Sequence, residues 1–383
     1  MRVERGRIDN VLRLARLRYR MRGAAHALGS APNGNRSCGL IPAFRPGNCG
    51  ESAIELRVST NGRPFFAGLA RCSSVWECPV CAPRIQSGRA AELVELNRRH
   101  VATGGEMYLA TLTLPHTRAD QLREMRKTVS RTWQRVCNGA PWKKWRRRLA
   151  LGGSVRALEV TTGPNGWHPH LHVALYTAAP LGAELLGEFT AWLSERWARF
   201  IVKAGYRMPS DEHGVRVEPL RKTNYLAKMG LADEISRASS KEGRDGHRTP
   251  FQVLRDIALG EPGPARDRDV KIWRAWARGI RGARQLTFSR GLTATAAAYA
   301  VALTRDDADL PDTQSELEGL GVDDSQLVRA FSIEEWRVIT SSRSSVALRV
   351  RLLAIPLRFP SWEWEDQVIR VLDAARGLEP VPF

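Results

Sequence analysis

The chain has 383 residues, 43% hydrophobic and 26% charged, so it can bury a core and is not a disordered tail. It contains no run of about 18 apolar residues, and its charged N-terminus lacks the apolar segment of a secretory signal. We therefore expect a cytoplasmic protein without a membrane span. The net charge is +19, yet residues 301–383 hold 9 Arg/Lys against 15 Asp/Glu. A basic body of this kind favours a nucleic-acid partner, the alternative being a basic protein without one.

Composition and periodicity divide the chain into a basic N-terminal arm (1–30), a loop-rich cysteine segment (31–100), a central domain (101–300) and a C-terminal accessory segment (301–383). The first two parts are expected to hold a helix or arm at 1–30, a strand at 54–58 and a helix at 82–100. The central domain is expected to hold strands at 107–114, 155–162, 168–176 and 215–220, and helices at 118–149, 181–204, 223–235, 251–259 and 270–280. This order predicts an α+β fold, with helices on one face of a central antiparallel β-sheet and a small cysteine-rich unit.

Five of the six cysteines lie between residues 38 and 81. Cys78-Pro-Val-Cys81 has the C-x-x-C spacing that places two thiolates on one tetrahedral ion, and Cys72 supplies a third ligand. Cys38 or Cys49 completes the set. We favour structural zinc over a redox pair or unligated thiols, because a redox C-x-x-C normally opens a helix after a strand and this one follows a loop.

Three histidines alternate along the expected strand at 168–176. Because side chains at i, i+2 and i+4 share a face, His168, His170 and His172 line up on one side of the sheet. A turn at Gly163-Pro-Asn-Gly166 folds Glu159 of the preceding strand toward them. Two histidines and one carboxylate leave coordination positions open, as a catalytic metal requires. The alternative is a sheet face with solvated or hydrogen-bonded histidines.

His170-Leu-His172 resembles the HUH motif (His, hydrophobic, His) of rolling-circle replication initiators, and the run from Glu159 to His172 resembles its form in bacterial plasmid Rep proteins. Upstream, the segment Thr111 to His116 is similar to their first motif. Downstream, Tyr225-Leu-Ala-Lys228 is similar to their tyrosine motif, Y-x-x-K. The resemblance covers about residues 38–292, and the three motifs occur in the family's order.

Two flanking segments extend the resemblance. Trp76 to Ala82 is similar to the cysteine segment before the nuclease domain of many such Rep proteins, and Gly282 to Ser289 to the end of that domain. Cys38 is followed by Gly39, as in the resembling proteins, which favours Cys38 over Cys49 as the fourth zinc ligand. The resemblance implies the HUH nuclease fold with an upstream zinc-binding unit.

The resemblance also implies a mechanism. A divalent ion, Mg²⁺ or Mn²⁺, held by Glu159, His170 and His172 would act on the scissile phosphate of single-stranded origin DNA. Tyr225 would then become joined to the DNA as a 5′-phosphotyrosine and release a 3′-OH for a polymerase. On a helix, Lys228 shares a face with Tyr225, where its ammonium favours the phenolate.

Three further residues, His116, His168 and Glu218, have less definite roles. His116 and His168 are secondary candidates, either as extra metal ligands or as orienting groups. Some families of this type place a Glu four residues before the tyrosine, where it activates a water for termination. Arg221 occupies that position here, and the nearest acid is Glu218, which leaves the termination residue unassigned.

The expected helix at 118–149 carries 11 Arg/Lys, which suits contact with a DNA backbone. Its tryptophans, Trp133, Trp142 and Trp145, either stack on bases or anchor the helix on the sheet. Its candidate DNA-binding residues are Arg126, Lys127, Arg131, Lys143, Lys144, Arg146 and Arg147.

Three alternative functions remain open. A mobilisation relaxase or single-strand transposase would use the same chemistry in another setting. A non-catalytic, zinc-bearing nucleic-acid-binding protein would not need Tyr225, and a metal hydrolase would form no protein–DNA bond. The sequence contains no Walker A loop, so a separate host helicase and DNA polymerase are expected partners.

Overall fold

The computed structural model describes residues 2–29, 38–43, 54–59, 62–220, 246–299, 301, 325–342 and 344–377. The expected helix at 223–235, with Tyr225 and Lys228, lies outside the described residues, as do Cys49 and Arg221. The chain forms two compact units, unit 1 of residues 1–88, 257–261 and 306–383, and unit 2 of residues 89–256 and 262–305. Within the described ranges, no helix has the length and apolar character needed to cross a membrane.

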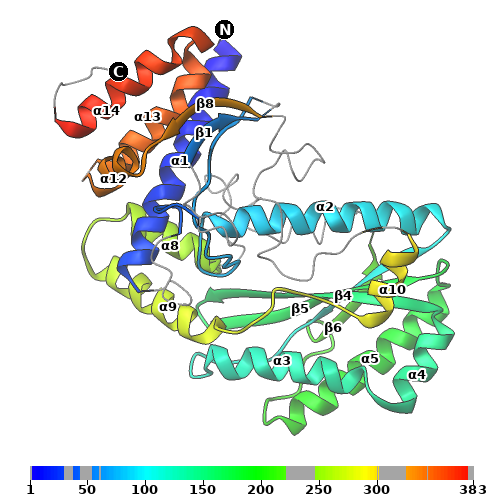
Figure 1. The fold of residues 1–383 in the computed structure, drawn as a ribbon. Coiled ribbons are helices and arrows are strands. Elements are labelled where there is room, and N and C mark those ends of the chain that lie inside the picture. Colours follow the sequence, from blue (N-terminus) through cyan, green and yellow to red (C-terminus); the bar gives the residue numbers. More distant parts are fainter. Residues whose placement is uncertain are drawn as a thin grey trace. The chain divides into compact units, whose positions relative to one another are not determined.

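Unit 2 is built on a five-stranded antiparallel sheet (Figure 1). Its strand order is β6 (Val215–Pro219), β3 (Glu106–Leu112), β5 (Gly166–Thr177), β4 (Leu151–Gly163) and β7 (Leu286–Phe288). A second antiparallel sheet lies in unit 1. The predicted α+β class with a central antiparallel sheet is therefore confirmed.

In the β4–β5 hairpin, Gly163 is paired with Gly166, and the two residues between them form the turn. Gly166 has φ 92°, a conformation that costs little only for glycine. The register that follows sets Glu159 directly opposite His170 and Ala157 opposite His172. The predicted hairpin is confirmed, and it brings the carboxylate to the histidine strand.

Helices α3 (Leu122–Val136), α4 (Gly139–Arg148) and α5 (Ala183–Lys203) pack on the sheet face that holds Leu171 and Val173 (Figure 1). The expectation of one helix over 118–149 is wrong, because the chain breaks between α3 and α4. There the Asn138 side chain accepts a hydrogen bond from the N–H of Gly139, whose φ of 84° is not helical.

The tryptophans of α3 and α4 anchor these helices. Trp133, Trp142 and Trp145 are each less than a tenth exposed. The rings of Trp142 and Trp145 contact Trp192 of α5, with ring centroids 6.2 and 5.7 Å apart. Of the two roles considered for these side chains, the structure supports packing rather than stacking on bases.

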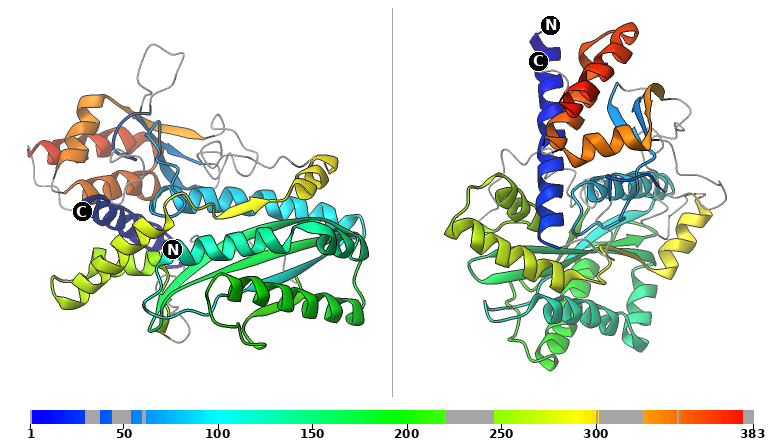
Figure 2. Two further views of the ribbon diagram at one scale, coloured as in Figure 1. Left: turned by 90° about the horizontal axis from the view of Figure 1, so that it is seen from below. Right: turned by 60° about the vertical axis from the view of Figure 1, so that its left-hand side comes forward.

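The opposite sheet face carries the histidines, and two of the described helices pack on part of it. The part of α2 (Cys81–Ala102) from residue 89 onward and α10 (Arg290–Ala298) pack on Met107, Leu109, Val155, Ala174 and Tyr176. The strand register places these residues at the end of the sheet away from the hairpin turn. Figure 2 shows the ribbon in two further views. Between β6 and β7, the described part of the chain forms helices α8 (Pro250–Leu259) and α9 (Pro264–Ile280).

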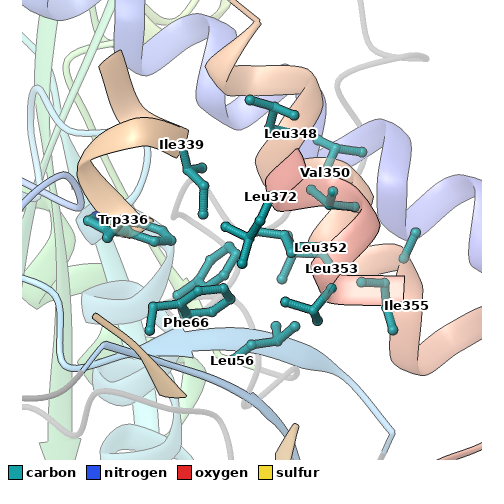
Figure 3. Close-up of a cluster of buried hydrophobic side chains, with 14 of the residues drawn as sticks. Leu56, Phe66, Trp336, Ile339, Leu348, Val350, Leu352, Leu353, Ile355 and Leu372 are labelled. Carbon is teal, nitrogen blue, oxygen red and sulfur yellow. The ribbon is translucent and has the colours of Figure 1, made fainter. Parts of the chain in front are cut away.

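Unit 1 joins the two ends of the chain in one core. Its sheet has the order β2 (Pro64–Ala67), β1 (Ile54–Val58) and β8 (Gln326–Phe331). The described helices of the same unit are α1 (Arg2–Ala27), α12 (Ile333–Ser341), α13 (Ser345–Arg358), the short η5 (Ser361–Glu363) and α14 (Trp364–Arg376). Trp336 and Leu372 pack against Leu56 and Phe66 in this core (Figure 3).

Candidate metal centres

Glu159, His170 and His172 converge at the turn end of the β4–β5 hairpin. Glu159 Oε2 lies 3.2 Å from His170 Nε2 and 3.1 Å from His172 Nε2. A metal bound to nitrogen or oxygen at about 2.0–2.2 Å holds neighbouring ligand atoms roughly 3–3.6 Å apart. The three ligand atoms lie within 4.8 Å of one another, so this group could hold a metal ion.

The remaining ring nitrogens orient both imidazoles. His172 Nδ1 lies 3.1 Å from Thr111 Oγ1, and His170 Nδ1 lies 3.4 Å from the carbonyl oxygen of His168. Thr111 is opposite His172 in the β3–β5 ladder, so the sheet register supplies this partner. When Nδ1 is held by another group, Nε2 is left to face Glu159, as ligating histidines require.

The electrostatics of the group favour an ionised carboxylate. Burial alone would raise the pKa of Glu159, but the charge and hydrogen bond of His170, with the hydrogen bond of His172, hold that pKa below its usual range. Burial also opposes the charged form of His170, yet Glu159 outweighs it and raises the pKa of that imidazole. At His172 burial dominates and lowers the pKa. A carboxylate beside a neutral imidazole is a suitable ligand set for a divalent ion.

The two secondary histidines lie beside this group, and the structure adds a third that the sequence did not single out. The ring centroid of His168 lies 5.1 Å from that of His170, 5.0 Å from that of His116 and 6.0 Å from that of His247. Burial and these three neighbours lower the pKa of His168 to about 3. His247 was missed because it is a single histidine in a polar segment without periodicity, and no local signal marks it.

Glu218 lies on the same sheet face but outside the metal group. It is on β6, opposite Leu109 of β3, and β3 separates it from the histidine strand. Its carboxylate Oε2 is 2.7 Å from Arg216 Nη2, and both side chains are well exposed. The structure therefore separates Glu218 from the residues that could bind the ion.

The candidate DNA-binding residues lie on α3 and α4, which pack on the sheet face away from Glu159. Arg126 donates hydrogen bonds to the carbonyls of Gly279 and Arg281, and Lys127 pairs with Glu124 at 3.1 Å. The exposed members of the set are Arg131, Lys143, Lys144, Arg146 and Arg147. Contact with DNA remains a prediction for all seven, and a strand bound there would lie across the sheet from the metal group.

Unit 1 holds the second candidate metal centre. Cys38 Sγ lies 3.7 Å from Cys78 Sγ and 3.5 Å from Cys81 Sγ, and Cys72 Sγ lies 3.8 Å from Cys81 Sγ. Four thiolates at about 2.3 Å from a tetrahedral ion have sulfur atoms roughly 3.8 Å apart, so the group fits such an ion. Of the two candidates for the fourth ligand, Cys38 is in the group, and Cys49 lies outside the described residues.

Local backbone contacts hold the cysteine group together. Cys81 is the first residue of α2, and its N–H lies 3.4 Å from Cys78 Sγ. The guanidinium of the buried Arg22 donates to the carbonyl oxygen of Cys38 at 2.6 Å. Hydrogen bonds with the other three thiols lower the pKa of Cys81, whereas those at Cys72 and Cys78 mainly raise their pKa values. Without a cation the four thiols cannot all ionise, because like charges would repel.

The protein therefore has an α+β fold with two potential metal centres. One is formed by two histidines and a glutamate on one face of the antiparallel sheet, and the other by four cysteines in the second unit. Residues 67–339 match the family model described as "Replication protein", so the chain belongs to that family. The match includes Thr111, Glu159, both histidines of the group and Tyr225.

Two curated relatives are similar over part of the chain. "Protein rep" of Streptomyces lividans is 28% identical over 305 residues, covering 63% of this chain and 67% of that protein. "Neomycin resistance protein" of Streptomyces cyanogenus is 27% identical over 253 residues, covering 53% of this chain and 54% of that protein. No solved structure matches the chain.

Proposed function

We propose that this replication protein initiates plasmid rolling-circle replication by nicking single-stranded origin DNA. The observation that carries the proposal is the convergence of Glu159 Oε2 with the Nε2 atoms of His170 and His172 on one sheet face. This ligand set leaves room for a substrate oxygen, unlike a closed structural site. Membership of the replication protein family supports the choice of DNA as substrate.

In the proposed reaction, Glu159, His170 and His172 hold Mg²⁺ or Mn²⁺, which would polarise the scissile phosphate and offset its developing charge. Tyr225 Oη forms a bond to phosphorus as the bond from phosphorus to O3′ breaks. The tyrosine proton is lost, and the departing O3′ gains a proton. The products are a 5′-phosphotyrosine and a 3′-OH that a polymerase can extend, and the reverse reaction rejoins strands.

Other residues of the chain support these steps. Thr111 orients His172, and we propose that Lys228 favours the phenolate of Tyr225. The cysteine group, with its tetrahedral spacing, is proposed to bind a structural Zn²⁺ that holds the loops of unit 1. The exposed cations of α3 and α4 are proposed to contact the DNA backbone.

The test is a nicking assay on a single-stranded origin oligonucleotide with and without Mn²⁺. We expect Glu159→Gln to lower the nicking rate at least about 100-fold, because the variant removes a charged metal ligand. The matched control is Glu218→Gln, which removes a carboxylate from the same sheet face and should retain most activity. Equal activity of Glu159→Gln and wild type would overturn the metal assignment.

A further inference from the structure

Helix α1 of unit 1 carries two arginines that are wholly or partly buried. Arg18 and Arg22 are four residues apart, so they lie on one face of the helix. Arg22 is 4% exposed, and Arg18 is half-buried. Like charges at this spacing destabilise a helix, and burial removes the water that would solvate them. Both cations therefore need a partner within the fold.

No carboxylate of the described residues pairs with either guanidinium. Arg22 Nε donates to the carbonyl oxygen of Cys38 at 2.6 Å, but Arg22 Nη2 and Arg18 Nε are buried without a hydrogen-bond partner. A third cation adds to the imbalance. The guanidinium of the buried Arg349 lies over the ring of Tyr19, with Cζ 4.1 Å from the ring centroid, and its Nη1 also lacks a partner. Buried cations without a carboxylate indicate that a negative group is missing.

The four-cysteine group lies beside these cations and can supply that charge. Burial lowers the pKa of Arg22, and its charge interactions with Cys38 and Cys78 oppose this effect. Burial also lowers the pKa of Arg18, and Cys78 is among the groups that oppose it. Without an ion the four thiols cannot all ionise, because like charges repel. With Zn²⁺ bound, all four are thiolates and the ion neutralises only part of their charge. Only the ion-bound group is therefore strongly negative.

We propose that Arg18 and Arg22 are the counter-ions of the metal-bound cysteine group, so that Zn²⁺ binding and the packing of α1 on unit 1 stabilise each other. The inference rests on the proposed zinc centre and is independent of DNA nicking. Such coupling is reciprocal, because the factor by which packed α1 raises the ion affinity equals the factor by which the ion favours packed α1. Loss of the ion would leave the arginines without a counter-charge and would loosen α1.

The first measurement is the Co²⁺ affinity of the full-length protein, read from cobalt–thiolate absorption, which reports the cysteine group and not the glutamate–histidine group. Arg22→Gln can still donate to the Cys38 carbonyl but has no charge, so we expect an affinity lower by about 10–100-fold. Arg22→Lys keeps the charge and should recover most of the affinity. Arg20→Gln removes an exposed cation from the same helix and is the matched control, which should bind Co²⁺ as wild type does.

The outcomes separate the counter-ions from the metal centre itself. Equal affinity of wild type and Arg22→Gln would overturn the counter-ion assignment and leave the metal centre standing. Absence of cobalt–thiolate absorption in wild type would overturn both. Equal losses in Arg22→Lys and Arg22→Gln would mean that side-chain shape matters rather than charge, and would also overturn the assignment. Binding of inorganic phosphate that Arg22→Gln abolishes, with Co²⁺ affinity unchanged, would instead show that the arginines hold an external anion.

Hydrogen exchange of the backbone amides tests the coupling to α1. Leu12 holds the first half of α1 in the core of unit 1, so we expect Zn²⁺ to slow exchange mainly over residues 18–27. The slowing should be smaller in Arg22→Gln and in Arg18→Gln, and circular dichroism shows that the variants remain folded. Helix α14, which belongs to the same unit, is the internal control. Equal slowing of α1 and α14 would mean that the ion stabilises unit 1 as a whole, and would overturn the coupling.

Discussion

Thr111 and Glu159 set the orientation of His172 from opposite ends of its ring. The threonine hydroxyl lies 3.1 Å from Nδ1, and the carboxylate lies 3.1 Å from Nε2. Both contacts follow from the register of β5 with its two neighbours. Thr111 contacts neither ion nor DNA in this account, so it is a positioning residue whose effect should appear in metal affinity.

Replacing Thr111 with Val keeps the side-chain shape and removes the hydroxyl. Loss of such a partner typically weakens metal binding about 10–100-fold, and we expect a Mn²⁺ affinity lower by that factor for Thr111→Val. Isothermal titration with Mn²⁺ measures it. Thr190→Val, which removes a hydroxyl from α5, is the control and should bind as wild type does. Equal losses in both variants would mean that the effect is general destabilisation.

The buried thiol of Cys137, in the same unit, predicts how the free energy of unfolding changes with pH. Burial raises the pKa of its thiol to about 12. Between the ordinary thiol pKa and 12, the unfolded chain loses this proton and the folded chain keeps it, so stability falls as pH rises. Cys137→Ala should therefore lose less stability than wild type between pH 9 and 11 in urea denaturation, and native Cys137 should resist alkylation below that range. Parallel losses in the two proteins would contradict the pKa assignment.

Among the elements, the β4–β5 hairpin was the most predictable. Its period-2 pattern and the glycines at 163 and 166 specify a strand, a turn and a strand locally. The break between α3 and α4 was not foreseen, because basic residues continue on both sides of Asn138-Gly139 and hide the cap. The pairing of β1 with β8 could not be predicted either, because a local sequence pattern does not indicate which strand about 270 residues away will pair with it.

The contact between β4 and α10 gives a test at this scale. At Gly153 an added Cβ would lie 2.2 Å from the backbone nitrogen of Leu292, so the two elements approach too closely for any side chain. Gly153→Ala should lower the free energy of unfolding by about 1–3 kcal/mol or more, because the backbone must shift. Gly187→Ala, in an open position of α5, should raise it by roughly 0.5–1 kcal/mol. Urea denaturation compares them, and a neutral Gly153→Ala would contradict the packing described.

At the scale of the whole molecule, the two compact units have separate cores, and each contains one group of side chains that could hold a metal ion. The cysteine group and the core of Figure 3 belong to unit 1, and the glutamate–histidine group belongs to unit 2. The residues of both groups could be predicted from their spacing within short segments. The last part of the chain shares a core with β1 and β2 through long-range strand pairing. Residue spacing within short segments does not predict such pairing.

Trp336→Ala tests this separation. Trp336 is 1% exposed and its indole N–H donates to the carbonyl of Leu40 at 2.7 Å. The change should destabilise unit 1 by about 3–5 kcal/mol while Mn²⁺ affinity at the glutamate–histidine group persists. Trp362→Ala, at a position 81% exposed, should change stability by less than about 0.5 kcal/mol. Calorimetry measures the stability of both variants, and titration measures their Mn²⁺ affinity. Loss of Mn²⁺ binding in Trp336→Ala would contradict the claim that the glutamate–histidine group does not depend on the core of unit 1.

The central claim is that Tyr225 becomes joined to DNA through chemistry that depends on the glutamate–histidine group. Its most direct test is intact-mass spectrometry after incubation with a single-stranded origin oligonucleotide and Mn²⁺, followed by peptide mapping. We predict that the wild-type mass rises by the mass of the 3′ fragment, that the fragment maps to Tyr225, and that Tyr225→Phe and Glu159→Gln show no increase. Cleavage without a covalent adduct, or an adduct that persists in Tyr225→Phe, would contradict the account.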